Sequence, residues 1–432
     1  MKTVIMAGGK GTRISTIAHD IPKPMIHIAG KPVLEHEILC LKEQGFTELI
    51  ITVSHLADHI ANYFGDGSKF GVHIEYYIEE QPLGNAGALF KLKDKLTEDF
   101  LLLNADAVFD VDFNRLIAFH IQKGGLVTLF AHSNSHPYDS GLLITDEDGC
   151  VKQWLTKEDK RPKWYRNCVN AGLHVMNPTV LAMVDIDADL IGKVINGNRV
   201  KVDLDRQVLK PLCGTEKMFC YDSPEYIKDM GTPDRYEEVC KDFELGRVHS
   251  RNLKEKQKAI FLDRDGTINK YVGFLRNIDD FELLPGVAEA IKKINLSGYL
   301  AIVVTNQPVI ARGEVTFGGL REIHNKMETL LGQQGAFIDH IYFCPHHPHK
   351  GFDGEIADLK IECDCRKPQP GMLLKAANDF NIDLCQSWMI GDGENDIKAG
   401  KAAKCRTALI GTEDFGQDIC INSLNEFVDK IL

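Results

Sequence analysis

Ala259-Ile260-Phe261-Leu262-Asp263-Arg264-Asp265-Gly266-Thr267 is the stretch that decides the fold of the second half of this chain. It opens with a short, continuous apolar run, which is typical of a strand buried on both faces of a parallel sheet. The carboxylates of Asp263 and Asp265 follow at once, at the end of the strand, where open α/β sheets bind their ligands. Such a pair of acids also occurs without a function, so other motifs in the chain are needed to assign one to Asp263 and Asp265.

Similar apolar runs recur along the chain, separated by segments of helical character. They lie at 3–6, 48–53, 100–103, 300–304 and 388–390. A helix is predicted over 32–44, because Pro32 suits a first turn and Gly45 follows the end. A later helix is predicted after Thr232, with Pro233 in its first turn. This alternation of strands and helices predicts an α/β fold class.

The length of the chain, 432 residues, predicts two domains, because a single hydrophobic core rarely grows that large. Apolar periodicity is lost and charge is gained over 249–258. We therefore predict a first α/β domain over 1–246, a linker over 247–258 and a second α/β domain over 259–432.

The residue composition and the net charge of the chain exclude some classes of partner and predict its compartment. Hydrophobic residues make up 44% and charged residues 26% of the chain, as in globular proteins. A net charge of −12 argues against nucleic acid as a partner, since such binding needs a basic face. The sequence has no run of membrane-helix length and no recognisable signal peptide, so we expect no membrane partner and a cytoplasmic location. Twelve cysteines in such a chain predict reduced thiols and metal ligands.

The first predicted strand runs directly into Ala7-Gly8-Gly9-Lys10-Gly11-Thr12-Arg13. Glycines in this place let backbone N–H groups approach a polyphosphate, and the cations add charge. Alone, the loop also fits a plain turn, and its spacing matches neither the P-loop nor the dinucleotide fingerprint. The nearby Ile21-Pro22-Lys23-Pro24-Met25 sharpens the signal.

With these two motifs, residues 1–240 resemble the sugar nucleotidyltransferase family. Further segments match that family in order: Glu80-Gln81-Pro82-Leu83-Gly84-Asn85-Ala86-Gly87-Ala88, Asn104-Ala105-Asp106, Asn170-Ala171-Gly172 and Asp229-Met230-Gly231-Thr232-Pro233. Ala105 stands where the family usually has glycine, and Asn85 where it has threonine. The resemblance implies a Rossmann-like, GT-A-like domain in which a sugar-1-phosphate oxygen attacks the α-phosphorus of a nucleoside triphosphate. Such a reaction depends on positioning and charge neutralisation.

The same resemblance implies roles for individual side chains. Arg13 and Lys23 would stabilise the triphosphate and the transition state, and Asp106 and Asp229 would hold Mg²⁺. The remaining candidates bind substrates, and they are Ala7, Gly8, Gly9, Gly11, Thr12, Gln81 and Gly84 for the nucleotide and Lys157, Asn170 and Gly172 for the sugar phosphate.

In the second half, Thr305-Asn306-Gln307, Lys367 and Gly391-Asp392 follow the Asp263 motif in order. This series resembles the haloacid-dehalogenase (HAD) phosphatase superfamily over 258–415, with its Rossmann-like fold. The resemblance implies that Asp263 is the nucleophile and Asp265 the general acid and base. It also implies a phosphoryl group held by Thr305, Asn306 and Lys367, and Mg²⁺ held by Asp263, the carbonyl of Asp265 and Asp392.

Cys344-Pro345-His346 and Cys363-Asp364-Cys365 supply soft and borderline ligands in the number that a closed tetrahedral zinc site needs. Since no position stays open for water, the predicted Zn²⁺ is structural. The ligands implied are Cys344, His346, Cys363 and Cys365.

This zinc-binding loop, together with Ala311-Arg312-Gly313, resembles the heptose-bisphosphate and histidinol-phosphate phosphatases. Arg366 would then grip a second phosphate in a bidentate manner. Pro308-Val309 replaces the usual Ser-Gly of those enzymes and leaves the anomer preference open.

Taken together, the chain resembles a heptose 1-phosphate guanylyltransferase fused to a heptose-bisphosphate phosphatase. The phosphatase would remove the C7 phosphate of heptose 1,7-bisphosphate, and the transferase would join the heptose 1-phosphate to GMP from GTP. Guanine is inferred from this order of reactions. The expected partners are small-molecule substrates, and a homo-oligomer stays open.

Two other hypotheses are compatible with parts of the sequence. A mannose-1-phosphate or other hexose-1-phosphate nucleotidyltransferase could be fused to a histidinol-phosphate phosphatase, although those reactions share no intermediate. A nucleotide-sugar sensor would bind without turnover. The sensor hypothesis predicts that at least one catalytic residue has been lost, yet every catalytic residue that the resemblances imply is present.

Overall fold

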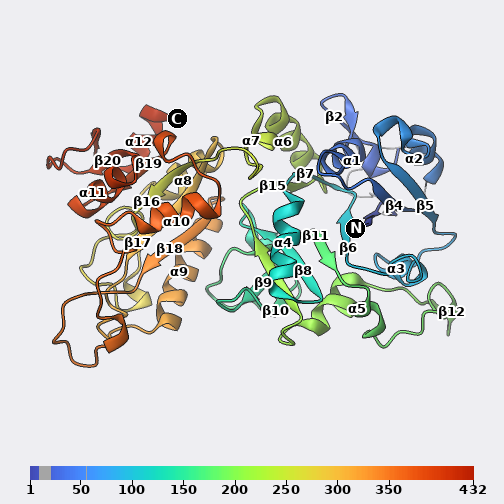
Figure 1. Cartoon of the computed structure of the whole chain (residues 1–432), viewed down its shortest axis with the longest axis horizontal. Helices are drawn as coiled ribbons and strands as arrows, with labels where there is room; N and C mark the ends of the chain where they lie inside the picture. The colour runs from blue at the N-terminus through green and yellow to red at the C-terminus, as the bar shows by residue number, and fades with distance from the viewer. Residues whose placement is uncertain (9–20, 55) are drawn as a thin grey trace. The chain divides into compact units, whose positions relative to one another are not determined.

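The computed structural model describes residues 1–8, 21–54 and 56–432, and Figure 1 follows the chain through them. Contacts divide the chain into two units. Unit 1 comprises Met1–Ala131, Leu143–Trp154 and Asn170–Asn252, and unit 2 comprises His132–Leu142, Leu155–Val169 and Leu253–Leu432. Two segments of the first half therefore have their contacts in unit 2, which the division made from sequence did not foresee.

The core of unit 1 is a mixed sheet. Its strands are β1 (Thr3–Met6), β4 (Glu48–Val53), β5 (His73–Ile78), β6 (Phe100–Asn104), β8 (Val127–His132), β9 (Leu142–Thr145), β10 (Val151–Leu155), β11 (Val169–Met176) and β14 (Met218–Asp222). They run in the order β10–β9–β11–β6–β1–β4–β5, and β8 pairs with both β11 and β14. β1 lies parallel between β4 and β6, so that Val4 is beside Ile50 and Leu102, and all three are buried. The apolar runs predicted as buried strands in this half are confirmed.

Helices and short ribbons complete unit 1. They are α1 (Val33–Glu43), α2 (Ala57–Phe64), α3 (Gly87–Lys91), α4 (Phe113–Lys123), α5 (Thr179–Ala182), α6 (Pro233–Glu244) and α7 (Arg247–Ser250), the 3-10 turns η2 (Lys23–Met25), η3 (Ser68–Phe70) and η6 (Lys210–Leu212), the π-helix η5 (Leu204–Leu209), and the paired strands β2 (His27–Ile28) with β3 (Lys31–Pro32), β7 (Ala107–Asp110) with β15 (Tyr226–Asp229) and β12 (Val194–Ile195) with β13 (Asn198–Arg199). α1 begins at Val33, one residue after the predicted start at Pro32, and Gly45 follows its end at φ +86°. Its Leu34, Ile38 and Leu41 enter the core beneath the sheet.

Unit 2 is built on a parallel sheet. Its strands are β16 (Lys258–Leu262), β17 (Tyr299–Asn306), β18 (His340–Cys344), β19 (Trp388–Gly391), β20 (Arg406–Ile410) and β21 (Ile419–Ile421), in the order β18–β17–β16–β19–β20–β21. Its helices are α8 (Val287–Asn295), α9 (Phe317–Gly332), α10 (Gly371–Asp379), α11 (Glu394–Ala402) and α12 (Leu424–Ile431), with the turns η4 (Pro137–Asp139), η7 (Ile278–Asp280), η8 (Ala357–Leu359) and η9 (Leu384–Gln386).

Side chains of β16 alternate between two separate cores of unit 2. Ile260 and Leu262 pack with residues of α8, α9 and α12, whereas Ala259 and Phe261 pack with residues of α10 and α11. A parallel sheet covered by helices on both faces is a doubly wound α/β fold. Each buried leucine or isoleucine in such a core contributes about 1.5–3 kcal/mol. The predicted fold class, two α/β domains with strands in alternation with helices, is confirmed.

The stretch 247–258, predicted as a linker, carries ordered structure. It contains α7, and its Val248 and Leu253 are buried, with 1% and 2% of their surface exposed. The change from unit 1 to unit 2 falls between Asn252 and Leu253. The packing of Val248 and Leu253 holds residues 248–253 against the buried side chains around them.

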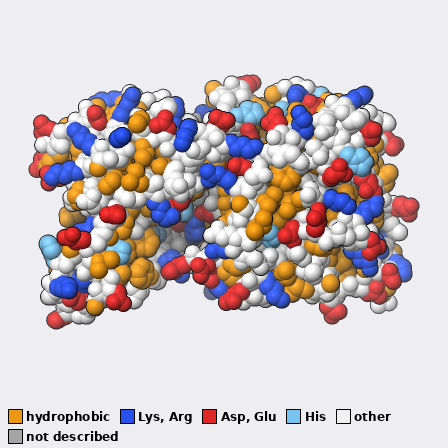
Figure 2. Space-filling model, in the orientation of Figure 1, with side chains coloured by type: hydrophobic (Ala, Val, Ile, Leu, Met, Phe, Trp, Pro, Cys, Tyr) orange, Lys and Arg blue, Asp and Glu red, His pale blue; other side chains and the backbone are white. Residues whose placement is uncertain are grey.

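The surface is charged with both signs. Lys and Arg side chains lie interspersed with Asp and Glu on the face drawn in Figure 2. Among the described residues, no helix combines the length and the apolar composition that spanning a membrane requires.

Candidate functional sites

A cavity of about 240 Å³ opens at the carboxyl ends of β16, β17 and β19 in unit 2. Adjacent strands bring the motifs together here, because the backbone N–H of Asp263 donates to the carbonyl of Ile390 on β19 at 2.9 Å. The lining includes every catalytic, phosphate-binding and magnesium-binding residue predicted for this half, namely Asp263, Asp265, Thr305, Asn306, Arg366, Lys367 and Asp392.

Lys367 is the buried cation at the base of this cavity. Its Nζ donates to Asp263 Oδ1 at 2.7 Å and to the carbonyl of Val304 at 2.8 Å, and it pairs with Asp396 Oδ1 at 2.6 Å. Burial alone would lower the pKa of Lys367, but the two carboxylates outweigh burial and raise the pKa. Asn306 fixes the main chain of this lysine, donating to its carbonyl at 2.9 Å and accepting from its N–H at 3.0 Å.

Asp396 is a site residue to which the sequence analysis gave no role. It lies four positions after Asp392, in the first turn of α11, and is 4% exposed. A Cβ atom at Gly391 would come within 2.2 Å of its Oδ2, so only glycine lets the carboxylate approach the end of β19. Sequence spacing did not show that Asp396 pairs with Lys367.

Three carboxylates gather beside Lys367. The oxygens of Asp263, Asp392 and Asp396 lie within 4.8 Å of one another. Burial raises the pKa of Asp263 to about 6, although Lys367 acts in the opposite direction, and burial followed by the charge of Asp263 raises the pKa of Asp392 to about 6. Carboxylate oxygens at this spacing suit a hard divalent cation such as Mg²⁺, whose charge would favour their ionised form.

Close packing of the main chain keeps this acid cluster tight. Gly266 has φ +86°, and a Cβ atom there would lie 1.9 Å from Asp392 Oδ2. The side chain of Asp265 points elsewhere, toward Arg264, Asn269 and Gln307. Asp265 would therefore reach a metal through its carbonyl, as the resemblance implied.

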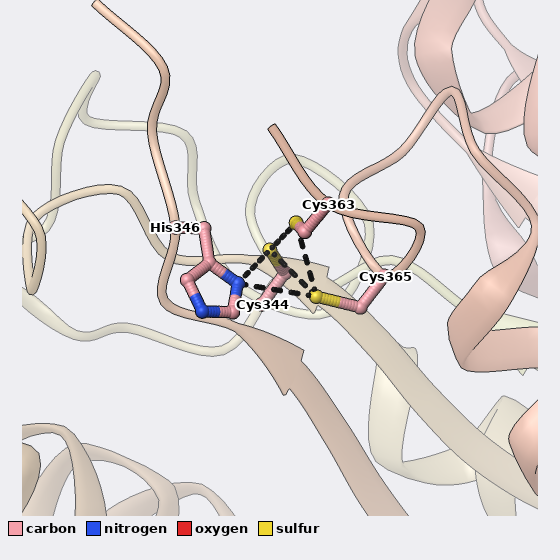
Figure 3. A group of neighbouring side chains, drawn as sticks. All are labelled: Cys344, His346, Cys363 and Cys365. Atoms are coloured by element: carbon pink, nitrogen blue, oxygen red, sulfur yellow. Dashed lines mark hydrogen bonds between the residues drawn. The ribbon is translucent and has the colours of Figure 1, made fainter. Parts of the chain in front are cut away.

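Three cysteines and a histidine converge at the end of β18 (Figure 3). The sulfurs of Cys344, Cys363 and Cys365 lie 3.2–3.5 Å apart. His346 points Nδ1 at the group, 3.7 Å from the Cys344 sulfur and 3.3 Å from the Cys365 sulfur. Tetrahedral zinc with ligand bonds of about 2.0–2.3 Å separates its ligand atoms by roughly 3.5–3.8 Å. The set fits zinc after a small expansion.

The three thiols of this group are linked to one another by hydrogen bonds. The structure describes all twelve cysteines, and none of them forms a disulfide bond. The hydrogen bond with Cys344 lowers the pKa of Cys365 to about 5 and raises the pKa of Cys344. Arg366 follows Cys365 directly, and its Nη1 donates to the carbonyl of His346 at 3.2 Å. The loop that carries the thiols therefore also positions Arg366 at the cavity.

In unit 1 the structure brings Lys23, Asp106 and Asp229 together. Lys23 Nζ is 2.7 Å from Asp106 Oδ2, and the lysine is 8% exposed. Asp106 lies between β6 and β7, and the pairing of β15 with β7 sets Asp229 opposite Ala107, the next residue along. Arg235, a residue that the sequence analysis did not name, lies 2.7 Å from Asp229 Oδ2. The pairing of β15 with β7, which could not be predicted from the sequence, brings the two predicted metal ligands, Asp106 and Asp229, next to each other.

The predicted sugar-contacting turn adjoins the same strands. Gly172 has φ +78°, and a Cβ atom there would lie 2.5 Å from Asn104 Nδ2. The Gly172 N–H is 3.4 Å from Asn170 Oδ1, which accepts its hydrogen bond. Lys157 is exposed and pairs with Asp139 at 2.6 Å, and its segment has its contacts in unit 2.

The predicted nucleotide-binding residues are only partly described. Ala7 is buried, and the Gly8 carbonyl accepts from Ser54 Oγ at 2.7 Å. Gln81 accepts a hydrogen bond from Arg199, and Gly84 has φ +89°. Gly9, Gly11, Thr12 and Arg13 lie outside the described residues.

One departure from the family pattern has a structural use. Asn85, which stands where the family usually has threonine, accepts a hydrogen bond from the N–H of Leu204 at 2.7 Å. The Gly84 backbone approaches Val202 so closely that a Cβ atom would lie 2.2 Å from its carbonyl oxygen. These contacts join the predicted base-binding segment to the chain that leads into η5.

Comparisons with known proteins divide along the same two halves. Residues 2–244, more than half of the chain, match the family model for nucleotidyl transferases. Residues 364–425 match a HAD-hydrolase-like family model. The crystal structure of HddC from Yersinia pseudotuberculosis covers 56% of this chain and 99% of its own, at 23% identity and a TM-score of 0.47.

Curated relatives resemble the phosphatase half. The chain is 43% identical over 158 residues to the D-glycero-β-D-manno-heptose-1,7-bisphosphate 7-phosphatase of Yersinia pestis, covering 37% of this chain and 82% of that enzyme. The corresponding enzyme of Escherichia coli K12 is 42% identical over 152 residues, covering 35% of this chain and 78% of that enzyme. The chain thus belongs to the nucleotidyl transferase family and, through its second part, to the family of the D-glycero-β-D-manno-heptose-1,7-bisphosphate 7-phosphatases.

Proposed function

We propose that this chain is a bifunctional enzyme that makes a nucleotide-activated heptose. Its phosphatase part removes the C7 phosphate of D-glycero-D-manno-heptose 1,7-bisphosphate, and its transferase part joins the resulting heptose 1-phosphate to GMP from GTP, releasing pyrophosphate. The observation that carries this proposal is the cavity in which Asp263, Lys367 and Asp392 meet, in a chain that is 43% identical to a heptose-bisphosphate phosphatase over 158 residues. The phosphatase product keeps its anomeric phosphate, the group that a sugar nucleotidyltransferase uses.

In the phosphatase part, Asp263 Oδ attacks the C7 phosphorus and the bond to the C7 oxygen breaks. Asp265 gives the departing oxygen its proton and then takes one from the water that hydrolyses the aspartyl-phosphate. Lys367 and Thr305 hold the phosphoryl group during both steps. Mg²⁺, held by Asp263, Asp392 and the carbonyl of Asp265, would shield the attacking carboxylate from the charge of the phosphate.

In the transferase part, the anomeric phosphate oxygen attacks the α-phosphorus of GTP in line. Lys23, and Arg13 from outside the described residues, neutralise the charge that develops on the triphosphate. Gly172 and Asn170 position the sugar, and Lys157 supplies a cation for its phosphate. Asp106 and Asp229 would hold Mg²⁺, which would supply positive charge for the phosphates.

We further propose that Zn²⁺ on Cys344, His346, Cys363 and Cys365 stiffens the loop that carries Arg366. That arginine would contact the far phosphate of the bisphosphate. The domain division that we propose is 1–246 for the transferase, 247–258 for the connection and 259–432 for the phosphatase. Small molecules are the proposed partners, the cytoplasm is the proposed location, and a homo-oligomer stays open.

Phosphatase substrate choice tests the first half of the proposal. We expect kcat/KM for heptose 1,7-bisphosphate to exceed that for histidinol phosphate by at least about 100-fold, since a site that grips two phosphates loses charge-assisted hydrogen bonds with a monophosphate. Phosphate release should be measured with the α and the β anomer of the bisphosphate and with histidinol phosphate. Activity on histidinol phosphate alone would overturn the proposal in favour of the fusion without a shared intermediate.

Zinc content tests the metal assignment. We expect about one zinc per chain in the native protein, and a large loss of zinc in the double variant Cys363→Ser, Cys365→Ser, because hydroxyls bind zinc poorly. Phosphatase activity should fall about tenfold or more as the loop loosens. Metal analysis after dialysis measures the first effect. The matched control Cys385→Ser, Cys420→Ser changes two exposed thiols and should keep its zinc, and equal zinc in both variants would contradict the assignment.

A further inference from the structure

Arg264 is a fully buried cation between the two proposed catalytic aspartates. None of its surface is exposed, and it is among the largest side chains buried so completely. Its Nη2 donates to both carboxylate oxygens of Asp265, at 2.9 and 2.7 Å, and its Nε donates to Oδ1 at 3.3 Å. A buried charge persists only when it is paired and hydrogen-bonded. The geometry is a bidentate grip, which fixes the plane of the carboxylate.

His324, in the middle of α9, supports the other side of the guanidinium. Its Nε2 lies 3.3 Å from Arg264 Nη1, and the side chain is 7% exposed. Arginine can only donate, so Nε2 accepts and the ring carries its proton on Nδ1. Burial, reinforced by the positive charge of Arg264, lowers the pKa of His324 to about 3, which keeps the ring neutral.

Two further donors complete the surroundings of the Asp265 carboxylate. Asn269 Nδ2 donates to Oδ1 at 3.0 Å, and Gln307 Nε2 donates to Oδ2 at 2.9 Å. Burial acts to raise the pKa of Asp265, but Arg264 and these donors outweigh it and lower the pKa. These contacts favour the ionised carboxylate, the form that takes a proton from water in the second step of the proposed reaction. Its orientation is fixed from three sides.

We propose that Arg264 and His324 are positioning residues that hold the carboxylate of Asp265 in the orientation needed for proton transfer. The proposal rests on the proposed function, in which Asp265 moves that proton. Among the described residues that line the cavity, neither Arg264 nor His324 occurs. Loss of the support should therefore slow the chemistry and leave substrate binding intact, because a small misplacement of a reacting group is costly.

The test uses three variants of the full chain. His324→Leu removes the acceptor and keeps an apolar side chain of similar bulk, His324→Gln offers a carbonyl acceptor, and Met327→Leu changes another buried residue of α9 as a packing control. We expect kcat of the phosphatase to fall about 10–100-fold in His324→Leu with KM within about twofold of native. His324→Gln should recover most of that loss, and Met327→Leu should stay near the native values.

Assays with heptose 1,7-bisphosphate and p-nitrophenyl phosphate separate this proposal from the proposed function. If the native enzyme releases phosphate from p-nitrophenyl phosphate but not from the bisphosphate, the proposed substrate is wrong. The assay with p-nitrophenyl phosphate still tests the role of His324, because the aspartyl-phosphate must be hydrolysed with both substrates. A native kcat in His324→Leu, equal losses in the Leu and Gln variants, or a loss carried by a raised KM would overturn the positioning role. Should His324→Leu fail to fold, Arg264→Lys, which keeps the charge without the fork, decides by the same kcat and KM criteria.

Discussion

Asp263→Asn is expected to lower phosphate release from heptose 1,7-bisphosphate by about 10⁴-fold or more, because removing a nucleophile removes the covalent route. The amide keeps the shape of the side chain but cannot attack phosphorus. The exchange removes a charge that lies 2.7 Å from Lys367 Nζ, but Asp396 still pairs with this lysine at 2.6 Å, so the site should stay folded around the amide. Transfer of GMP to added heptose 1-phosphate should continue at the native rate, measured as pyrophosphate release.

Asp353→Asn is the matched control for this variant, since it makes the same exchange at an exposed position of the loop between β18 and α10. It should retain native phosphatase activity. Release of phosphate by Asp263→Asn within about tenfold of the native rate would show that another group is the nucleophile. A simultaneous loss of pyrophosphate release would show instead that the variant disturbs the whole chain.

Lys23→Ala is expected to lower the transferase rate by about 10²–10³-fold, the usual cost of removing a preorganised group that stabilises developing charge. Lys23 is buried and held 2.7 Å from Asp106, so its ammonium group is already fixed before the triphosphate binds. Phosphate release should be unchanged. The variant should therefore convert heptose 1,7-bisphosphate into heptose 1-phosphate and stop there, which chromatography of the sugar phosphates measures.

Lys31→Ala removes an exposed lysine that pairs with Glu35 and serves as the control for Lys23→Ala. It should make nucleotide sugar at the native rate. Thermal unfolding of both variants should be compared, because Lys23→Ala leaves Asp106 without its partner. A stable Lys23→Ala protein with a native transferase rate would contradict the catalytic role of Lys23.

Strands and strand-end motifs could be predicted from sequence because their signals are local. A continuous apolar run such as 259–262 predicts a buried strand, and the acids that follow it must lie at the sheet edge. The same logic gave α1, whose limits are set by Pro32 and by the turn at Gly45. The four residues proposed to bind zinc were also a local signal, since two short pairs of residues supply the whole set.

Long-range pairing could not be predicted in this way. Asp229 meets Asp106 only through the pairing of β15 with β7, and His324 meets Arg264 from 60 positions further along the chain. The assignment of 132–142 and 155–169 to unit 2 likewise depends on tertiary contacts. A buried histidine on an amphipathic helix resembles an ordinary core residue until its neighbour is known. Only the folded chain supplies that neighbour.

The proposed sequence of two reactions can be tested by incubating the native protein with heptose 1,7-bisphosphate and one nucleoside triphosphate at a time, namely GTP, ATP, CTP or UTP. Mass spectrometry of the products should find GDP-heptose with GTP, together with one phosphate and one pyrophosphate for each sugar consumed. If heptose 1-phosphate forms but no triphosphate yields a nucleotide sugar, the proposed sequence of two reactions is contradicted. If a nucleotide sugar forms with another triphosphate and not with GTP, the choice of guanine is wrong.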